Sequence, residues 1–199
     1  MHYQLKGVEG FPRPFGGESP LMMNAGTSPS GRSFAIRFSD LHFDGVRLPH
    51  ESIDRIADTK RRARDAGRDV QVWTPIGVVC RPSQREADEF AHYVVEHVDV
   101  GSIGHLADLH EADVAGRPDD QSAFRRAGEG PRERQVIARG NFCAIGEPDR
   151  VALEIVQLHE VGYDGIVLNF VNYLDEFPYF AQEVLPRLEA AGVRSRLAG

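Results

Sequence analysis

The sequence predicts an α/β protein made of parallel strands joined by helices. Short apolar runs alternate with amphipathic stretches about four times along the 199 residues. The apolar runs are strand-sized and nearly continuous, which is typical of parallel strands covered on both faces. Strands that alternate with helices need crossover connections, which place the strands in one parallel sheet. Since a complete eight-fold barrel takes roughly 250 residues, the chain is expected to form a small open sheet or part of a barrel.

The first β/α unit follows a lead-in over 1–19, which is rich in Gly and Pro and is expected to be irregular. The apolar run 20–25 predicts a buried strand that ends at Gly26. Thr27-Ser28-Pro29 then provides N-cap oxygens followed by a proline at the first helical position. The helix that follows is expected to bury one face, formed by Phe34, Ala35 and Phe38.

Two further units are predicted before the middle of the chain. Residues 40–46 indicate a strand and residues 51–66 a helix. The inward side chains of this helix are expected to be Ile53, Ile56, Ala57 and Ala63. Residues 70–80 predict a long strand, after which Ser83 caps the next helix with Glu86 at the capping-box position. The buried face of that helix is expected to consist of Ala87, Phe90, Ala91 and Val94.

The carboxyl-terminal part follows a polar, Gly-rich stretch over 100–136, which is expected to be an insertion with one or two short helices. Residues 148–161 predict an amphipathic helix, 165–171 a strand, and 174–191 the last helix. The inward residues of the last helix are expected to be Phe177, Phe180, Ala181, Val184, Leu185 and Leu188. All units are expected to form one domain over 1–199.

Composition argues against several classes of function. The chain has 23 basic and 30 acidic residues, a net charge of −7, and no basic block, so neither nucleic acid nor an anionic membrane surface is expected as a partner. It shows no signal-peptide pattern and no apolar run long enough to span a membrane, so a cytoplasmic location is expected. Its two cysteines, Cys80 and Cys143, make no disulfide framework and are expected to be core residues.

The eight histidines lack the spacing of a metal site. His92 and His97, like His105 and His110, are five positions apart, which places the members of each pair about 140° apart on a helix. Neither a His-Glu-x-x-His string nor a Gly-x-Ser-x-Gly elbow occurs. Zinc chemistry and Ser/His/Asp hydrolysis are therefore not expected.

The strongest chemical signal is the segment 26–33, Gly-Thr-Ser-Pro-Ser-Gly-Arg-Ser, between a predicted strand and a predicted helix. Glycines let a ligand approach the backbone, and the amides of a helix N-terminus favour an anion. The string nearly matches a nucleotide P-loop, but Arg32 stands where that motif has Lys, and no strand ending in Asp follows to hold magnesium. Phosphate binding without nucleotide hydrolysis is predicted. The alternative is that these residues serve only the helix cap and the turn.

A second signal lies at the carboxyl end of the strand 165–171, the end at which barrel active sites lie. Asn172 and Tyr173 present an amide, a phenol and an aromatic face there, and they are expected to border a polar organic substrate. The alternative is that Asn172 only turns the chain. Asp175 and Glu176 are expected only to interact with the helix dipole.

Three segments, in this order, resemble the bacterial luciferase-like flavin-dependent monooxygenases: 23–35 with Asn-Ala-Gly-Thr-Ser-Pro-Ser-Gly-Arg, 140–151 with Ile-Gly-Glu-Pro, and 163–188 with Tyr-Asp-Gly-Ile-Val-Leu-Asn-Phe. The resemblance implies the carboxyl-terminal half of a (β/α)8 TIM barrel. It also implies reduced FMN supplied by a separate flavin reductase, with O2 used to oxidise a small organic substrate. The residues it places around the flavin phosphate are Ala25, Gly26, Thr27, Ser28, Gly31 and Arg32.

Two alternatives on this fold stay open: a deazaflavin-dependent oxidoreductase that transfers hydride, and a non-catalytic flavin- or phosphate-binding barrel fragment. Half a barrel has two open edge strands and an apolar sheet face. The chain is therefore expected to self-associate or to bind a partner half-barrel.

Overall fold

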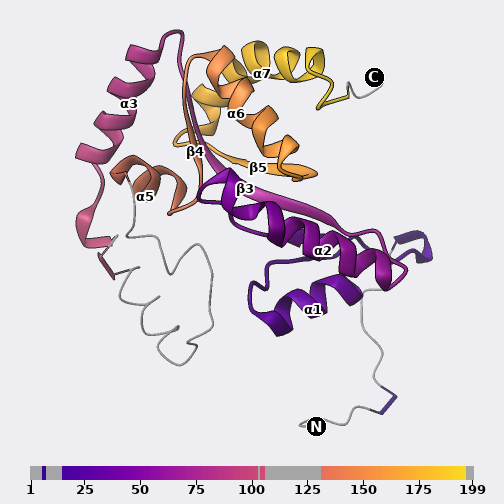
Figure 1. Ribbon diagram of the computed structural model, residues 1–199. Coiled ribbons are helices and arrows are strands. Elements are labelled where there is room, and N and C mark those ends of the chain that lie inside the picture. Colours follow the sequence, from indigo (N-terminus) through magenta and orange to yellow (C-terminus); the bar gives the residue numbers. More distant parts are fainter. Residues whose placement is uncertain (1–5, 8–14, 103, 106–130, 196–199) are drawn as a thin grey trace.

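The computed structural model describes residues 6–7, 15–102, 104–105 and 131–195, which form one parallel sheet with helices packed against it (Figure 1). The elements in chain order are η1 (Phe15–Gly17), β1 (Met23–Asn24), α1 (Pro29–Phe38), β2 (Leu41–Phe43), η2 (Pro49–Ser52), α2 (Ile53–Asp65), β3 (Gln71–Cys80), α3 (Gln84–Glu96), α5 (Arg132–Ala138), β4 (Cys143–Gly146), α6 (Pro148–Glu160), β5 (Gly165–Asn169) and α7 (Tyr173–Ala190). This order confirms the predicted α/β class. Most of the predicted lead-in and of the predicted insertion lies outside the described residues.

Every strand pairing in the sheet is parallel, and β3 is the central strand. The sheet runs β1-β2-β3-β4, and β5 also pairs with β3. Trp73 of β3 pairs with both β2 and β5, whereas Gly77 of β3 pairs with both β4 and β5. Because a strand has only two edges, β2 and β4 share one edge of β3 and β5 occupies the other. The predicted β/α units supply β1, β2, β3 and β5, and β4 is an additional strand that extends the line of β2.

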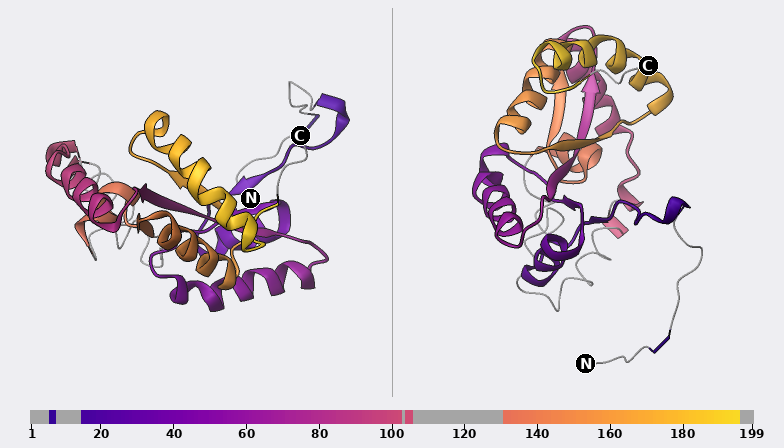
Figure 2. Two further views of the ribbon diagram at one scale, coloured as in Figure 1. Left: turned by 90° about the horizontal axis from the view of Figure 1, so that it is seen from above. Right: turned by 90° about the vertical axis from the view of Figure 1, so that its right-hand side faces the viewer.

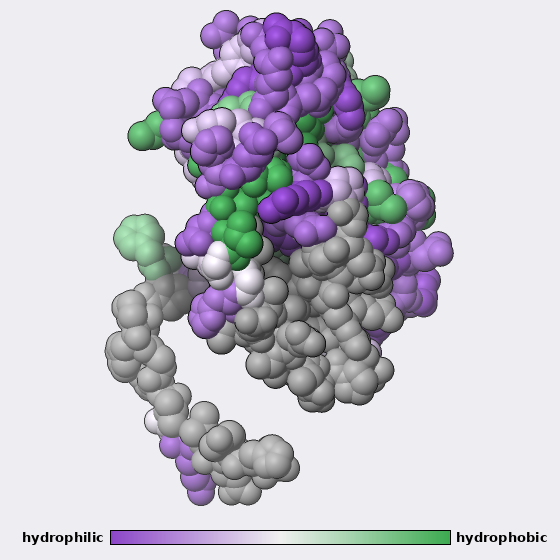
Figure 3. Space-filling view, turned by 90° about the vertical axis from the view of Figure 1, so that its left-hand side faces the viewer, coloured by the Kyte–Doolittle hydropathy of each residue, from purple (hydrophilic) through white to green (hydrophobic). Residues whose placement is uncertain are grey.

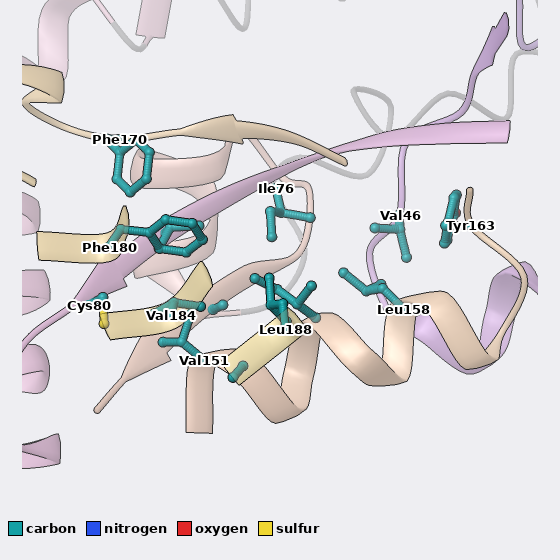
Figure 4. Packing of buried hydrophobic residues seen from close by; sticks show 14 of the residues in the cluster. Val46, Ile76, Cys80, Val151, Leu158, Tyr163, Phe170, Phe180, Val184 and Leu188 are labelled. Atoms are coloured by element: carbon teal, nitrogen blue, oxygen red, sulfur yellow. The ribbon is translucent and has the colours of Figure 1, made fainter. Parts of the chain in front are cut away.

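The main core lies between one face of the sheet and the helices α6 and α7 (Figure 4). Alternate residues of β3 point into it, since side chains alternate between the two faces of a strand. Its buried residues include Val72, Ile76, Val78, Val151, Leu158, Tyr163, Phe180 and Val184. The helices α1 and α2 pack together (Figure 2), and α2 adds Ile56 to the main core. A smaller buried cluster there joins Ile36, Ala63 and Val70.

The opposite face of the sheet is less well covered. Leu41, Phe43, Trp73, Pro75 and Val167 lie on it and are only partly buried. Among the described elements α5 packs against this face at Gly77, where an added Cβ would lie 2.9 Å from the Cβ of Ala138. The Trp73 indole lies over Gly165, where an added Cβ would come within 2.3 Å of the ring. The indole thus occupies the space that a side chain at position 165 would need.

Several side chains predicted to point inward are exposed instead. Ile53 is 46% exposed and Phe177 45%, and the predicted core face of α1 is wrong for Phe34 and Phe38, which are 44% and 50% exposed. In α1 the buried residues are Ala35 and Ile36. Helical periodicity identifies an apolar stripe, but it cannot tell whether the chain provides an element to cover that stripe.

Candidate functional site at the carboxyl ends of the strands

The loop between β1 and α1 has the geometry of a capped helix N-terminus. Ser28 is extended and its Oγ accepts the N–H of Gly31 at 3.1 Å, while Pro29 occupies the first turn. Asn24 Oδ1 accepts the N–H of Gly26 at 2.8 Å, which folds the chain back after β1. The predicted cap is therefore confirmed. The hydroxyls of Ser28 and Ser30 lie 3.2 Å apart on the outer side of this loop.

Gly26 and Gly31 are needed where they stand because their backbones touch. A Cβ on Gly26 would lie 2.7 Å from Gly31 Cα, and a Cβ on Gly31 would lie 2.8 Å from Gly26 Cα. Both distances are shorter than carbon atoms tolerate, so any side chain would push the loop away from the helix. The two glycines thus allow the loop to pack directly on the first turn of α1, and this packing fixes the position of a helix N-terminus, where an anion is favoured.

Two cationic or titratable side chains beside this loop have unsatisfied nitrogens. Arg32 Nε is buried with no hydrogen-bond partner, and neither ring nitrogen of His42 makes a hydrogen bond of good geometry. His42 is 1% exposed. It pairs with Asn24 across the β1–β2 ladder, so it lies beside the start of the loop. Burying a donor without a hydrogen-bond partner costs free energy. An anion bound at this helix N-terminus would be attracted by the positive charge of Arg32.

Burial lowers the pKa of His42 below its ordinary value, and the positive charges of Arg32 and Arg55 lower it further. Asp44 and the Asn24 backbone oppose this shift but do not overcome it. His42 is therefore neutral at pH 7. This residue could not be identified from the sequence, because a single histidine within a strand does not reveal its burial.

The segment after β5 begins α7, and both of its predicted substrate residues make internal contacts. Asn172 Oδ1 caps α7 by accepting the N–H of Leu174 at 3.1 Å. Tyr173 Oη donates to the carbonyl of Leu168 at 2.9 Å, and its ring, 53% exposed, makes an edge contact with Phe170. The alternative stated for Asn172 was that it only turns the chain, and the structure shows that it caps α7. The exposed face of Tyr173 is the part that remains available to a substrate, and that role stays a prediction.

Glu176 does more than the predicted interaction with the helix dipole. Its side chain is 4% exposed and lies 3.0 Å from the Arg81 guanidinium, which follows directly after β3. Its other oxygen accepts the N–H of Asn172 at 2.7 Å. Arg81 also stacks on the Phe90 ring at 3.8 Å. This buried ion pair joins the end of β3 to the start of α7, and the sequence offered no signal for it because the partners are far apart in the chain.

The two predicted site segments both lie at the carboxyl ends of the strands, but within the described residues they are not adjacent. Both follow carboxyl ends of parallel strands, so both belong to the rim at which barrel active sites form. The strands β2 and β3 separate β1, which leads into the phosphate loop, from β5, which leads into Asn172 and Tyr173. A ligand that touches both segments would therefore extend across this rim.

The described residues hold no group of three or more His, Cys, Asp or Glu that could bind a metal ion. Burial raises the pKa of Cys80 to about 11 and that of Cys143 to about 12. Both thiols are therefore protonated at neutral pH, which fits their predicted core role. No helix in the described ranges is long and apolar enough to cross a membrane.

The chain is thus a β/α protein of the barrel class, with a parallel sheet and a glycine-containing loop at the carboxyl ends of its strands. The sequence model of the luciferase-like monooxygenases matches residues 1–165, and the chain belongs to this family. It is 27% identical over 202 residues to the FMNH2-dependent dimethylsulfone monooxygenase of Pseudomonas fluorescens strain Pf0-1, covering 99% of this chain and 53% of that protein. It is 26% identical over 213 residues to the sulfoquinovose monooxygenase of Agrobacterium fabrum, covering 96% and 52%.

Among solved structures, DmoA from Hyphomicrobium sulfonivorans matches with a TM-score of 0.72 at 19% identity, covering 89% of this chain and 42% of that chain. This likeness concerns the fold, and it confirms that the β/α units are those of a luciferase-like TIM barrel. The chain spans about half the length of the relatives that it matches.

Proposed function

We propose that this chain contributes the flavin-phosphate site of an FMN-dependent monooxygenase that oxidises a small organic substrate with O2. The observation that carries the proposal is the loop 25–32. There, two glycines in backbone contact and a serine-capped helix N-terminus lie beside an unpaired arginine nitrogen. Relatives named as FMNH2-dependent monooxygenases support the choice of reduced FMN over a deazaflavin.

The residues present fit the phosphate end of FMN. Gly26 and Gly31 let the loop pack directly on the first turn of α1, so the helix N-terminus would face the phosphate, and the hydroxyls of Thr27 and Ser28 would add donors. Arg32 supplies positive charge. Ala25, exposed immediately after β1, is too small to obstruct the approach. Reduced FMN, when bound, supplies the chemistry of O2 activation, while the protein binds and orients it and excludes water.

The remaining components of the reaction follow from the same proposal. A separate flavin reductase would deliver the reduced cofactor, since the relatives are named for their dependence on FMNH2. The organic substrate would contact the exposed face of Tyr173 and the neighbouring Asn172. The relatives act, by name, on dimethylsulfone and sulfoquinovose.

The test compares FMN with riboflavin, which lacks the phosphate. We expect the wild-type chain to quench FMN fluorescence with an affinity about tenfold higher than for riboflavin, because a hydrogen bond to a charged group contributes roughly 1.5–3 kcal/mol. Ser28→Ala and Gly31→Val should each remove this preference. Ser83→Ala is the matched control, since Ser83 caps α3 in the same way by accepting the N–H of Glu86 at 3.3 Å. Equal binding of FMN and riboflavin by the wild type, or a preference kept in both loop variants, would refute the proposed site.

A further inference from the structure

His42 is a buried histidine in the middle of β2 whose two ring nitrogens have no hydrogen-bond partner of good geometry among the described residues. In the parallel register it stands between Asn24 of β1 and Val72 of β3. Paired residues of neighbouring strands share a face of the sheet, and Val72 belongs to the main core. The imidazole therefore points to the helix-covered face. A buried polar side chain without partners costs free energy, so its presence beside a candidate ligand site calls for an explanation.

The charges that act on His42 are not balanced. Arg32 of α1 and Arg55 of α2 are positive, and among the described residues that act on the ring Asp44 alone is negative. The Asp44 carboxylate is already paired, because its Oδ2 accepts Arg55 Nε at 2.5 Å. Asn24 offers the ring only its neutral backbone. A proton on His42 would therefore be a third positive charge in a buried group with one negative charge, which explains why the free chain holds this imidazole neutral.

A phosphate at the loop 25–32 would change this balance. The loop begins directly after Asn24, the strand partner of His42, and it ends at Arg32, whose buried Nε has no partner within the described ranges. A phosphate monoester carries a charge of about −1.5 to −2 at pH 7. Arg32 can offset only about one of these charges. The remaining negative charge would act on the His42 ring through a medium of low dielectric constant, and it would favour the protonated imidazole.

We propose that His42 takes up one proton from solvent when the phosphate of FMN binds at the loop 25–32. The proton adds to the ring nitrogen that carries the lone pair, so both ring nitrogens become donors, and the Asn24 backbone is placed to accept from one of them. Asn24 also holds the loop, since its Oδ1 accepts the N–H of Gly26 at 2.8 Å. His42 is thus a positioning residue for the phosphate end of the flavin. The inference rests on the proposed function, because it needs a phosphate at this loop.

A histidine with a purely structural role would behave differently. If His42 only filled the space between the sheet and the helices, its replacement would change the free energy of unfolding and would alter FMN binding equally at every pH. Linked protonation gives another result. Because the complex would bind the proton more tightly than the free chain does, the affinity for the phosphate rises as the pH falls, by at most about tenfold per pH unit for one proton.

The test measures the dissociation constants of FMN and riboflavin by fluorescence quenching between about pH 5.5 and 7.5. The flavin phosphate itself takes up a proton at about pH 6, so the readout is the FMN affinity of the wild type divided by that of His42→Gln. We expect this ratio to rise about three- to tenfold as the pH falls, and the same ratio for riboflavin to stay constant.

His92→Gln is the matched control for the loss of a histidine. The His92 side chain is 68% exposed on α3, and the side of the molecule formed by α3 and α5 is mainly hydrophilic with a small hydrophobic area (Figure 3). Its imidazole is already in contact with water and lies on an element that does not carry the loop. His92→Gln should therefore follow the wild type at every pH.

A second measurement uses the wild-type chain and does not depend on the folding of a variant. In NMR spectra the imidazole of His42 should show a pKa that rises on saturation with FMN and does not change with riboflavin. The inference is overturned if this pKa is the same with FMN, or if folded His42→Gln keeps the pH profile of the wild type. The phosphate site would survive either result as long as FMN binds more tightly than riboflavin. If the wild type shows no such preference at any pH, the site and this inference fail together.

Discussion

Replacing Arg81 with Met should destabilise the fold by about 3 kcal/mol, because it leaves the Glu176 carboxylate buried without its charged partner. Breaking a buried ion pair typically costs about 3–5 kcal/mol. The lower part of this range applies because the Arg81 side chain is 22% exposed, although that of Glu176 is only 4% exposed. Met retains the aliphatic stem over Phe90 but loses the cation–π contact, which contributes roughly 0.5–1 kcal/mol.

The assay is urea denaturation followed by far-ultraviolet circular dichroism, with the free energy of unfolding extrapolated linearly. Glu176→Gln in the Arg81→Met background removes the unpaired charge and keeps an acceptor for the Asn172 N–H, so it should recover about 2 kcal/mol. Arg85→Met is the matched control, because the Arg85–Glu89 pair is shorter, 2.7 Å against 3.0 Å, but its side chains are 76% and 61% exposed. The reasoning is refuted if Arg81→Met destabilises the protein no more than Arg85→Met does.

Two further predictions concern titrating groups. Because burial lowers the pKa of His42, the unfolded chain binds a proton below about pH 6.5 that the folded chain does not bind. Stability should therefore fall between pH 7.5 and 5.5, and His42→Gln should flatten this fall by up to about 1 kcal/mol in denaturation curves; an unchanged slope would contradict the shift. Because burial raises the pKa of Cys80 to about 11 and that of Cys143 to about 12, an aromatic disulfide reagent at pH 8 should label both thiols slowly in the native chain and rapidly in urea. Rapid labelling of the native chain would be inconsistent with this assignment.

Most helices could be predicted from sequence because the information for them is local. Ser28 and Ser83, both predicted as caps, cap α1 and α3 through their own side chains, and each lies within a few residues of the amide whose N–H it accepts. The long strand β3 and the strand β5 were also predicted from their continuous apolar runs. Turn and cap chemistry of this kind depends on spacing along the chain, which a single sequence displays.

The strand β4 could not be predicted in the same way. It has four residues, Cys143–Gly146, and neither alternation nor length distinguishes so short a run. Its pairing is with Gly77–Cys80, the part of β3 that extends past β2. The strand therefore exists because a distant segment provides an open edge, and that information is not local.

The same distinction explains what the sequence did and did not predict at the site. The glycines and the cap of the loop 26–31 are local features, and the structure places them together as expected. The burial of His42 and the pairing of Glu176 with Arg81 depend on which side chains the sheet buries and which it brings close together. Polar residues at strand ends could therefore be predicted from the sequence as candidates for ligand contact. The buried pair of Glu176 and Arg81 at the start of α7 could be identified only from the structure.

The exposed apolar residues show where local spacing and tertiary packing disagree. Phe34, Phe38 and Phe177 have the helical spacing of core residues, and the prediction that they point inward was wrong only because no described element covers them. Trp73 and Phe43 similarly occupy strand positions that face inward in a closed barrel. The spacing of residues therefore identifies an apolar stripe, whereas its burial depends on whether another element packs against it.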